Sequence, residues 1–187
     1  MTMSLKYFFK LIVVSNIIIT NCVAQKINTI ESVKYDDTKN VTIYSVFPFG
    51  NVSINGEWAK THFNSSSGQQ FFINKDSVEI AISLNSYKNF EFNLHHPKSG
   101  FDFVKNYYDW DSKYFVDNSQ LKREIIKQDS VNNYIIWRLF GENNGVYVDN
   151  LFLFGITNKT SKNFMIKTNK MDIDSKTNFL TNIYLNK

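Results

Sequence analysis

Two long apolar segments joined by Asn144-Gly145 constrain the fold more than any other feature of the sequence. Asn-Gly favours a type I′ turn, in which both central residues take positive φ, so the pattern predicts a two-residue β-hairpin. Such a loop places Trp137 opposite Phe152 and Ile135 opposite Phe154. Apolar residues fall on both faces, Ile135, Trp137, Leu139, Val148, Phe152 and Phe154 on one, and Tyr134, Ile136, Phe140, Tyr147, Leu151 and Leu153 on the other. We therefore expect the hairpin to lie in the centre of a sheet that is covered on both sides.

Runs of β-branched and aromatic residues between turn residues predict the other strands. Residues 78–84 alternate apolar and polar side chains, which is typical of a half-buried strand, and 87–94 are expected to be its hairpin partner. The remaining expected strands cover residues 41–47, 57–63, 69–73, 121–128, 134–140, 146–157 and 163–168. Residues 25–40 are polar and are expected to form a lead-in before the domain.

Two segments have helical periodicity. Ser99 is expected to begin the first helix, because Asp102 follows it at the spacing of a capping box. Residues 172–186 are amphipathic and should dock on the sheet. The order of elements predicts an α+β fold, with a single antiparallel sheet of about six to seven strands and two main helices packed on it. We expect this one domain to span residues 41–187.

The first helix, over residues 101–115, carries two adjacent apolar stripes. Phe101, Val104, Tyr108 and Phe115 form one stripe, and Phe103, Tyr107, Trp110 and Tyr114 form the other. The second stripe is either a buried core face or an exposed surface that binds a protein partner.

Three charged residues fall among apolar ones and are candidates for buried charge. Asp111 lies within the apolar arc of the first helix, where a carboxylate needs a partner or a raised pKa, so we expect a salt bridge or a backbone hydrogen bond there. Arg138 and Asp149 lie on one face of the central hairpin. We expect these two to neutralise each other or to pair with a helix residue.

Residues 1–24 have the pattern of a secretory signal peptide. Lys6 and Lys10 accompany an apolar run over residues 11–19 that is too short to span a bilayer comfortably. The protein is therefore expected to be exported.

Two processing routes remain open. Cleavage after Ala24 would leave Gln25 as the first residue of a freely secreted or periplasmic protein. Alternatively, Ile19-Thr20-Asn21-Cys22 resembles a bacterial lipobox, and lipidation of Cys22 would tether the protein to the outer membrane. A lipid anchor at Cys22 is the one membrane contact that we expect.

The composition favours a globular domain and argues against a nucleic-acid partner. The chain has 187 residues, is 43% hydrophobic and contains 17 Phe, 10 Tyr and 3 Trp, which is enough to build one packed core. Loss of Lys6 and Lys10 with the leader lowers the net charge from +4 to +2, and no basic stripe remains. Cys22 is the single cysteine, so no intramolecular disulfide forms.

The sequence lacks the common catalytic motifs, including a nucleophile elbow, a phosphate-binding loop and a dinucleotide fingerprint. His62, His95 and His96 are its three histidines. Adjacent histidines rarely share a tetrahedral site, so we expect no metal and no cofactor. One alternative is a small hydrolase that uses Asp111 with His62 or His95, and another is a carrier that holds a hydrophobic ligand between helix and sheet.

The order of elements over residues 57–185 resembles the PsbP-like fold, which includes a eukaryotic Ran-binding protein and several bacterial envelope lipoproteins. The resemblance lies in the early strand with Glu57 and Trp58, the aromatic helix over 101–115 and the closing helix over 179–185. Small secreted and lipoprotein domains of Gram-negative bacteria are also similar. The resemblance implies a non-catalytic role in binding or assembly, because members of that fold mostly work as accessory subunits. We thus expect an envelope module that recognises a protein partner.

Overall fold

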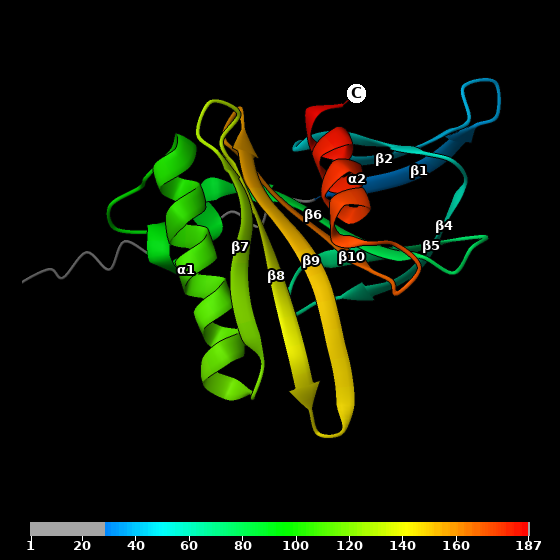
Figure 1. Cartoon of the computed structure of the whole chain (residues 1–187). Coiled ribbons are helices and arrows are strands. Elements are labelled where there is room, and N and C mark those ends of the chain that lie inside the picture. Colours follow the sequence, from blue (N-terminus) through cyan, green and yellow to red (C-terminus); the bar gives the residue numbers. More distant parts are fainter. Residues whose placement is uncertain (1–28, 187) are drawn as a thin grey trace, which may run out of the picture.

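A computed structural model describes residues 29–186, so the leader, its two processing sites and Cys22 lie outside the described residues. The fold is α+β, with a seven-stranded antiparallel sheet, a second sheet of three strands and two α-helices (Figure 1). The strand order in the large sheet is β4-β5-β6-β10-β9-β8-β7. These strands are β4 (Trp58–Asn64), β5 (Gln69–Asn74), β6 (Glu79–Ser86), β7 (Lys122–Asp129), β8 (Tyr134–Asn143), β9 (Val146–Thr157) and β10 (Thr160–Lys167).

The two helices cover opposite faces of the large sheet (Figure 1). α1 (Gly100–Asn118) packs on β7, β8 and β9, whereas α2 (Ile173–Leu185) packs on β9 and β10 from the other side. The small sheet shares the α2 side and consists of β1 (Ile30–Asp36), β2 (Val41–Phe47) and β3 (Gly50–Asn55). The central strands are therefore buried between two hydrophobic cores, one on each face.

The central hairpin has the predicted turn and register. Asn144 and Gly145 take φ values of 52° and 76°, as a type I′ turn requires. Trp137 pairs with Phe152 and Ile135 pairs with Phe154. The rings of Trp137 and Phe152 stack with their centroids 4.5 Å apart, so the pair that the turn brings into register also packs the core beneath α1.

The sequence predicts one sheet, and the structure has two. Residues 30–36, expected in a polar lead-in, form β1, and β3 is an additional strand that the sequence pattern does not indicate. β1 is an edge strand with most of its side chains exposed, and Val33 is the residue that it packs against the core. In β3 just Val52 and Ile54 are buried. Strands with so few buried side chains carry a weak alternation of apolar and polar residues.

The prediction of a strand at residues 87–94 is wrong, because this segment forms two short 3₁₀-helices, η1 (Tyr87–Asn89) and η2 (Glu91–Asn93). β6 pairs with β10 instead. The buried side chain of Asn93 donates to the carbonyl groups of Tyr87 and Lys98 and accepts from the Lys98 amide, at 2.7–3.3 Å. These side-chain bonds to the backbone replace the ladder that a strand would need.

Both predicted helices form. Ser99 precedes α1 as expected, but its side chain makes no capping bond, and Asp102 pairs with Lys105 at 2.8 Å instead. The helix is therefore predicted correctly, whereas the prediction of a capping box is wrong. α2 begins after Asp172, whose carboxylate accepts from the Ser175 amide at 2.7 Å.

Candidate binding surfaces

The aromatic stripe of α1 divides into a buried and an exposed half. Phe103 and Tyr107 are 0% and 4% exposed, whereas Trp110 and Tyr114 are 43% and 65% exposed. The ring of Tyr107 stacks on Phe154 of β9 with the centroids 4.1 Å apart. The first half of the stripe is therefore core, and the second half lies on the surface.

The segment of η1 and η2 determines where this division falls. Phe90 and Phe92 pack against Phe103 and Tyr107, with centroid distances of 4.6–5.9 Å. Both rings also reach Trp110, at 6.4 Å and 5.6 Å. Tyr114 lies one turn further on and makes its single aromatic contact, among the described residues, with Phe115. We call Trp110, Tyr114, Phe90 and Phe92 the aromatic strip.

A polar network lies beneath the buried half of the stripe. Gln69 donates to the side-chain oxygen of Asn163 at 3.2 Å, and the Asn163 amide nitrogen donates to the Tyr107 hydroxyl at 3.0 Å. Burial, reinforced by the charge of Asp111, raises the pKa of Tyr107, so the phenol stays protonated. The network ties α1 to β10 and β5 across the face of the sheet.

Asp111 lies beside Tyr107 and is half-buried. Among the described residues its carboxyl group has neither an ion-pair nor a hydrogen-bond partner, so the expected salt bridge or backbone hydrogen bond does not form. Burial raises the pKa of Asp111 to about 7, because the charged form loses its hydration without gaining a partner. A negative charge on Asp111 at neutral pH therefore costs stability.

Arg123 of β7 holds the second half of α1 in place. Its guanidinium donates to the hydroxyl of buried Ser112, which in turn donates to the carbonyl of Tyr108. The guanidinium also lies over the Tyr108 ring, 5.2 Å from the centroid. The turns that carry Trp110 and Tyr114 are thus anchored on the sheet even though these two side chains face outwards.

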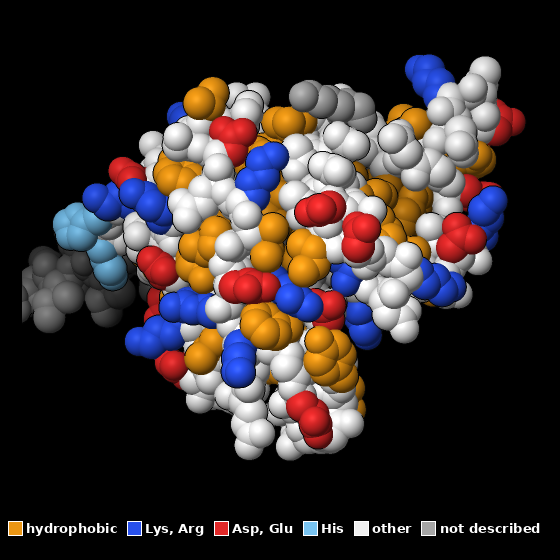
Figure 2. All heavy atoms as spheres, in the orientation of Figure 1, with side chains coloured by type: hydrophobic (Ala, Val, Ile, Leu, Met, Phe, Trp, Pro, Cys, Tyr) orange, Lys and Arg blue, Asp and Glu red, His pale blue; other side chains and the backbone are white. Residues whose placement is uncertain are grey.

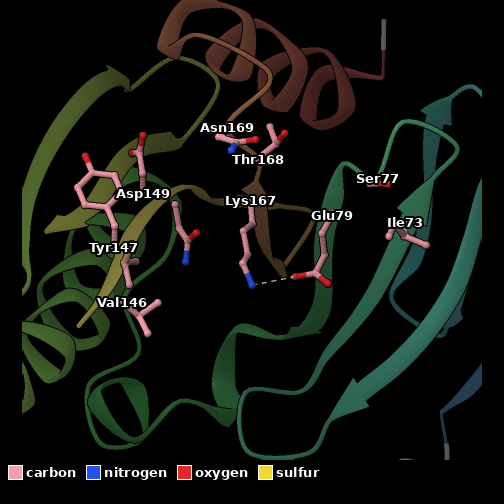
Figure 3. Close-up of a pocket in the computed structure, with 11 residues that line it drawn as sticks. Ile73, Ser77, Glu79, Val146, Tyr147, Asp149, Lys167, Thr168 and Asn169 are labelled. Atoms are coloured by element: carbon pink, nitrogen blue, oxygen red, sulfur yellow. Dashed lines mark ion pairs between the residues drawn. The ribbon is translucent and has the colours of Figure 1, made fainter. Parts of the chain in front are cut away.

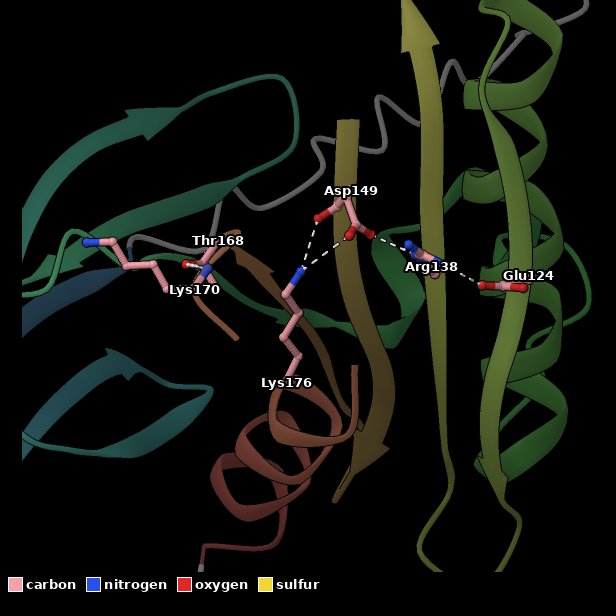
Figure 4. Close-up of polar contacts among 6 residues, drawn as sticks. All are labelled: Glu124, Arg138, Asp149, Thr168, Lys170 and Lys176. Atoms are coloured by element: carbon pink, nitrogen blue, oxygen red, sulfur yellow. Dashed lines mark hydrogen bonds and ion pairs between the residues drawn. The ribbon is translucent and has the colours of Figure 1, made fainter. Parts of the chain in front are cut away.

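Arg138 and Asp149 pair with each other, as expected, within a chain of charges that crosses four elements (Figure 4). Arg138 donates to Asp149 at 2.6 Å and to Glu124 of β7 at 3.1 Å. Lys176 of α2 lies 3.4 Å from the Asp149 carbonyl and 3.7 Å from its carboxylate, and its side chain is 2% exposed. Burial acts to raise the pKa of Asp149, but Arg138 and Lys176 outweigh it and hold that pKa below its usual value.

The three histidines do not converge with Asp111 or with one another on a described cavity. His62 stacks on Phe71 with the ring centroids 4.1 Å apart, and His95 and His96 are exposed in the loop before α1. Two cavities among residues 29–186, one beside β9 and one beside Tyr35, Trp58 and Ile73, are lined neither by a histidine nor by Asp111. Within residues 29–186, no group of three or more His, Cys, Asp or Glu side chains is arranged to hold a metal ion.

A cavity of about 680 Å³ lies at the end of the large sheet, between the projecting part of β9 and the ends of β5, β6 and β10 (Figure 3). Val146, Tyr147 and Asp149 form one wall, and Lys167 and Glu79 face each other across the floor at 3.6 Å. We call this site the β9 step. No local sequence pattern marks this site, because it depends on β9 continuing past the end of β10.

Charges of both signs are interspersed on the molecular surface. Figure 2 shows acidic, basic and apolar side chains side by side over the part of the molecule where β7, β8 and β9 lie, with no patch of a single sign on this face.

Two residues of these sites were not identified from the sequence. The sequence does not indicate that Lys176 is buried, because a lysine in a helix is ordinarily solvated. The sequence does indicate that Tyr147 lies near the tip of the hairpin, since it follows the Asn-Gly turn.

Among residues 29–186, no helix is long and apolar enough to cross a bilayer. No protein-family model matches the chain, and no curated protein or solved structure is significantly similar to it.

Proposed function

We propose that this protein is a non-catalytic binding or assembly module of the cell envelope and that it recognises a protein partner through the aromatic strip. The observation that carries the proposal is the exposure of Trp110 and Tyr114 on a helix whose other apolar side chains are buried or half-buried. Trp and Tyr are the residue types most enriched where proteins bind tightly, because a large, rigid ring loses little conformational entropy when a partner covers it.

The strip combines exposure with rigidity. Trp110 rests against Phe90 and Phe92, and the neighbouring Ser112 is held by Arg123. A preorganised aromatic surface binds more tightly than a mobile one, since less ordering is required on association. The expected family is consistent with this role, because proteins of the PsbP-like fold mostly serve as accessory subunits.

The envelope location is part of the proposal and rests on the leader sequence. Mass spectrometry of the protein purified from its host tests it. A first residue at lipidated Cys22 or at Gln25 supports export, and it also decides between the two processing routes. A protein that retains Met1 in the cytosol contradicts the proposed location.

Capture from the native envelope, followed by a binding measurement with the purified captured protein, tests recognition. Trp110→Ser/Tyr114→Ser should weaken the affinity by at least about tenfold while leaving the fold intact. Phe63→Thr/Ile125→Thr is the matched control, because these apolar side chains are similarly exposed, at 53% and 41%, on the two edge strands. Equal affinity of the two double variants would refute recognition through the aromatic strip.

A further inference from the structure

The β9 step arises from the unequal lengths of neighbouring strands. The ladder between β9 and β10 ends at the pair Asn150–Lys167, and residues 146–149 of β9 continue beyond it, paired with β8 alone. Figure 1 shows the hairpin of β8 and β9 reaching past the ends of the other strands. On the side of β10, residues 146–149 therefore pair with no strand among the described residues, although β9 is a central strand of the sheet.

The hydrogen-bonding pattern of the hairpin identifies the main-chain groups that face this edge. In a two-residue hairpin the residues flanking the loop, here Asn143 and Val146, bond to each other, and every second residue then points away from the partner strand. The N–H and C=O groups of Tyr147 and Asp149 consequently face the step. The carbonyl of Asp149 is consistent with this hydrogen-bonding pattern, because it accepts a bond from Lys176 rather than from β8.

The outer edges of the large sheet are protected, and the step is not. The pairing of β4 shifts by a bulge between Lys60 and Phe63, and that of β7 by a bulge between Ile125 and Lys127. Bulges and charged side chains hinder the addition of another strand. Residues 146–149 pair with β8 in unbroken register, and Val146 and Tyr147 are 63% and 69% exposed.

The lining of the step indicates the chemistry of its occupant. Its charged side chains are already paired within the protein, Glu79 with Lys167 and Asp149 with Arg138 and Lys176. Ile73, Val146 and Val148 supply apolar surface. A charged ligand would have to compete with these internal pairs, whereas an uncharged segment leaves them intact.

We propose that the β9 step binds an extended, uncharged peptide segment of a partner protein, which adds to β9 as a strand in line with β10. An added strand bonds to the N–H and C=O of Tyr147 and to the N–H of Asp149 while continuing the pleat of the sheet, and the Asp149 carbonyl keeps its bond from Lys176. Residues 146–149 offer a length of about 13 Å, and the cavity of about 680 Å³ suits roughly four residues of such a peptide. This site is separate from the aromatic strip.

A library of random octapeptides displayed on phage, selected against the whole protein purified from its host, tests the proposal. Selected peptides should be uncharged at the central positions. Tyr147→Pro removes the N–H that faces the step and leaves the bonds to β8 in place, so it should weaken peptide binding by at least about tenfold. Tyr147→Thr is the matched control, because it removes the ring but keeps the N–H, and its affinity should stay within about threefold.

Amide hydrogen exchange provides an independent measurement. A bound peptide should slow exchange at Tyr147 and Asp149 and leave Val148 unchanged, because the N–H of Val148 already bonds to β8. Trp110→Ser should not alter peptide binding, since the two sites are separate. Failure to enrich any peptide, equal binding by the Pro and Thr variants, or protection at other amides would each overturn the proposal. So would a dimer that Tyr147→Pro disrupts, because a second copy would then cover the step.

Discussion

The two halves of α1 carry the same kind of side chain in different surroundings. The segment of η1 and η2 covers Phe103 and Tyr107, whereas Trp110 contacts its edge and Tyr114 lies beyond it. The helical pattern is continuous across this division. An aromatic stripe therefore predicts a helix and its orientation, whereas the burial of each ring depends on which part of the stripe a distant segment covers.

Truncation in the buried half should have the largest effect. Phe103→Ala removes a ring that is 0% exposed and contacts four other aromatic side chains in this core. We expect the free energy of unfolding to fall by about 3–5 kcal/mol, because the cavity cannot collapse among such large rings. Urea denaturation followed by circular dichroism measures the change, and a loss below about 1 kcal/mol would contradict burial of the first half.

A similar contrast separates the two partly buried carboxylates, Asp149 with partners and Asp111 without. Asp149→Asn leaves Arg138 and the buried ammonium of Lys176 without their shared anion. We expect a loss of about 2–4 kcal/mol at pH 7. The pKa of Asp149 is lowered in the folded state, so this difference should persist above about pH 4 and shrink as the pH falls through that lowered pKa. Unfolding curves across this range measure it.

Asp111→Asn should raise the free energy of unfolding, whereas Asp149→Asn lowers it. The folded-state pKa of Asp111 is raised to about 7, so the folded form holds a proton that the unfolded chain releases above about pH 4. The wild type therefore loses stability between these two values, and the variant does not. A shift of about three pKa units corresponds to about 4 kcal/mol, and solvent screening of a half-buried carboxylate roughly halves this effect. We therefore expect the variant to be more stable by about 2 kcal/mol at pH 8 and equal to the wild type near pH 4. A variant that is less stable at both pH values would contradict an unpaired carboxylate.

The smallest effect on stability is expected in the exposed half of α1. Trp110→Ala should lower the free energy of unfolding by about 1 kcal/mol or less, because the ring is 43% exposed and rests on Phe92 at its edge. The comparison with Phe103→Ala is the informative result. A loss as large as that of Phe103→Ala would show that Trp110 belongs to the core.

Much of the architecture was predictable because local chemistry determines it. The Asn144-Gly145 turn fixes the register of the central hairpin, and β9 has the predicted bounds, from Val146 to Thr157. The helix after Ser99 and the helix after Asp172 follow from periodicity. Arg138 and Asp149 pair because the register places them on one face.

The remaining features depend on contacts between distant segments. The small sheet was not predictable, since β1 places little more than Val33 against the core. The unpaired state of Asp111 depends on which side chains the sheet presents to α1. The β9 step depends on where β10 ends relative to β9, and no local pattern marks that difference.

Hydroxyl-radical footprinting of the complex with the captured partner directly tests recognition through the aromatic strip, because aromatic side chains are oxidised when they are accessible. In the free protein, Trp110, Tyr114 and Phe63 should all be modified, since each is more than 40% exposed. We expect the partner to protect Trp110 and Tyr114 and to leave Phe63 reactive. Unchanged oxidation of Trp110 and Tyr114 in a saturated complex would contradict recognition through the aromatic strip.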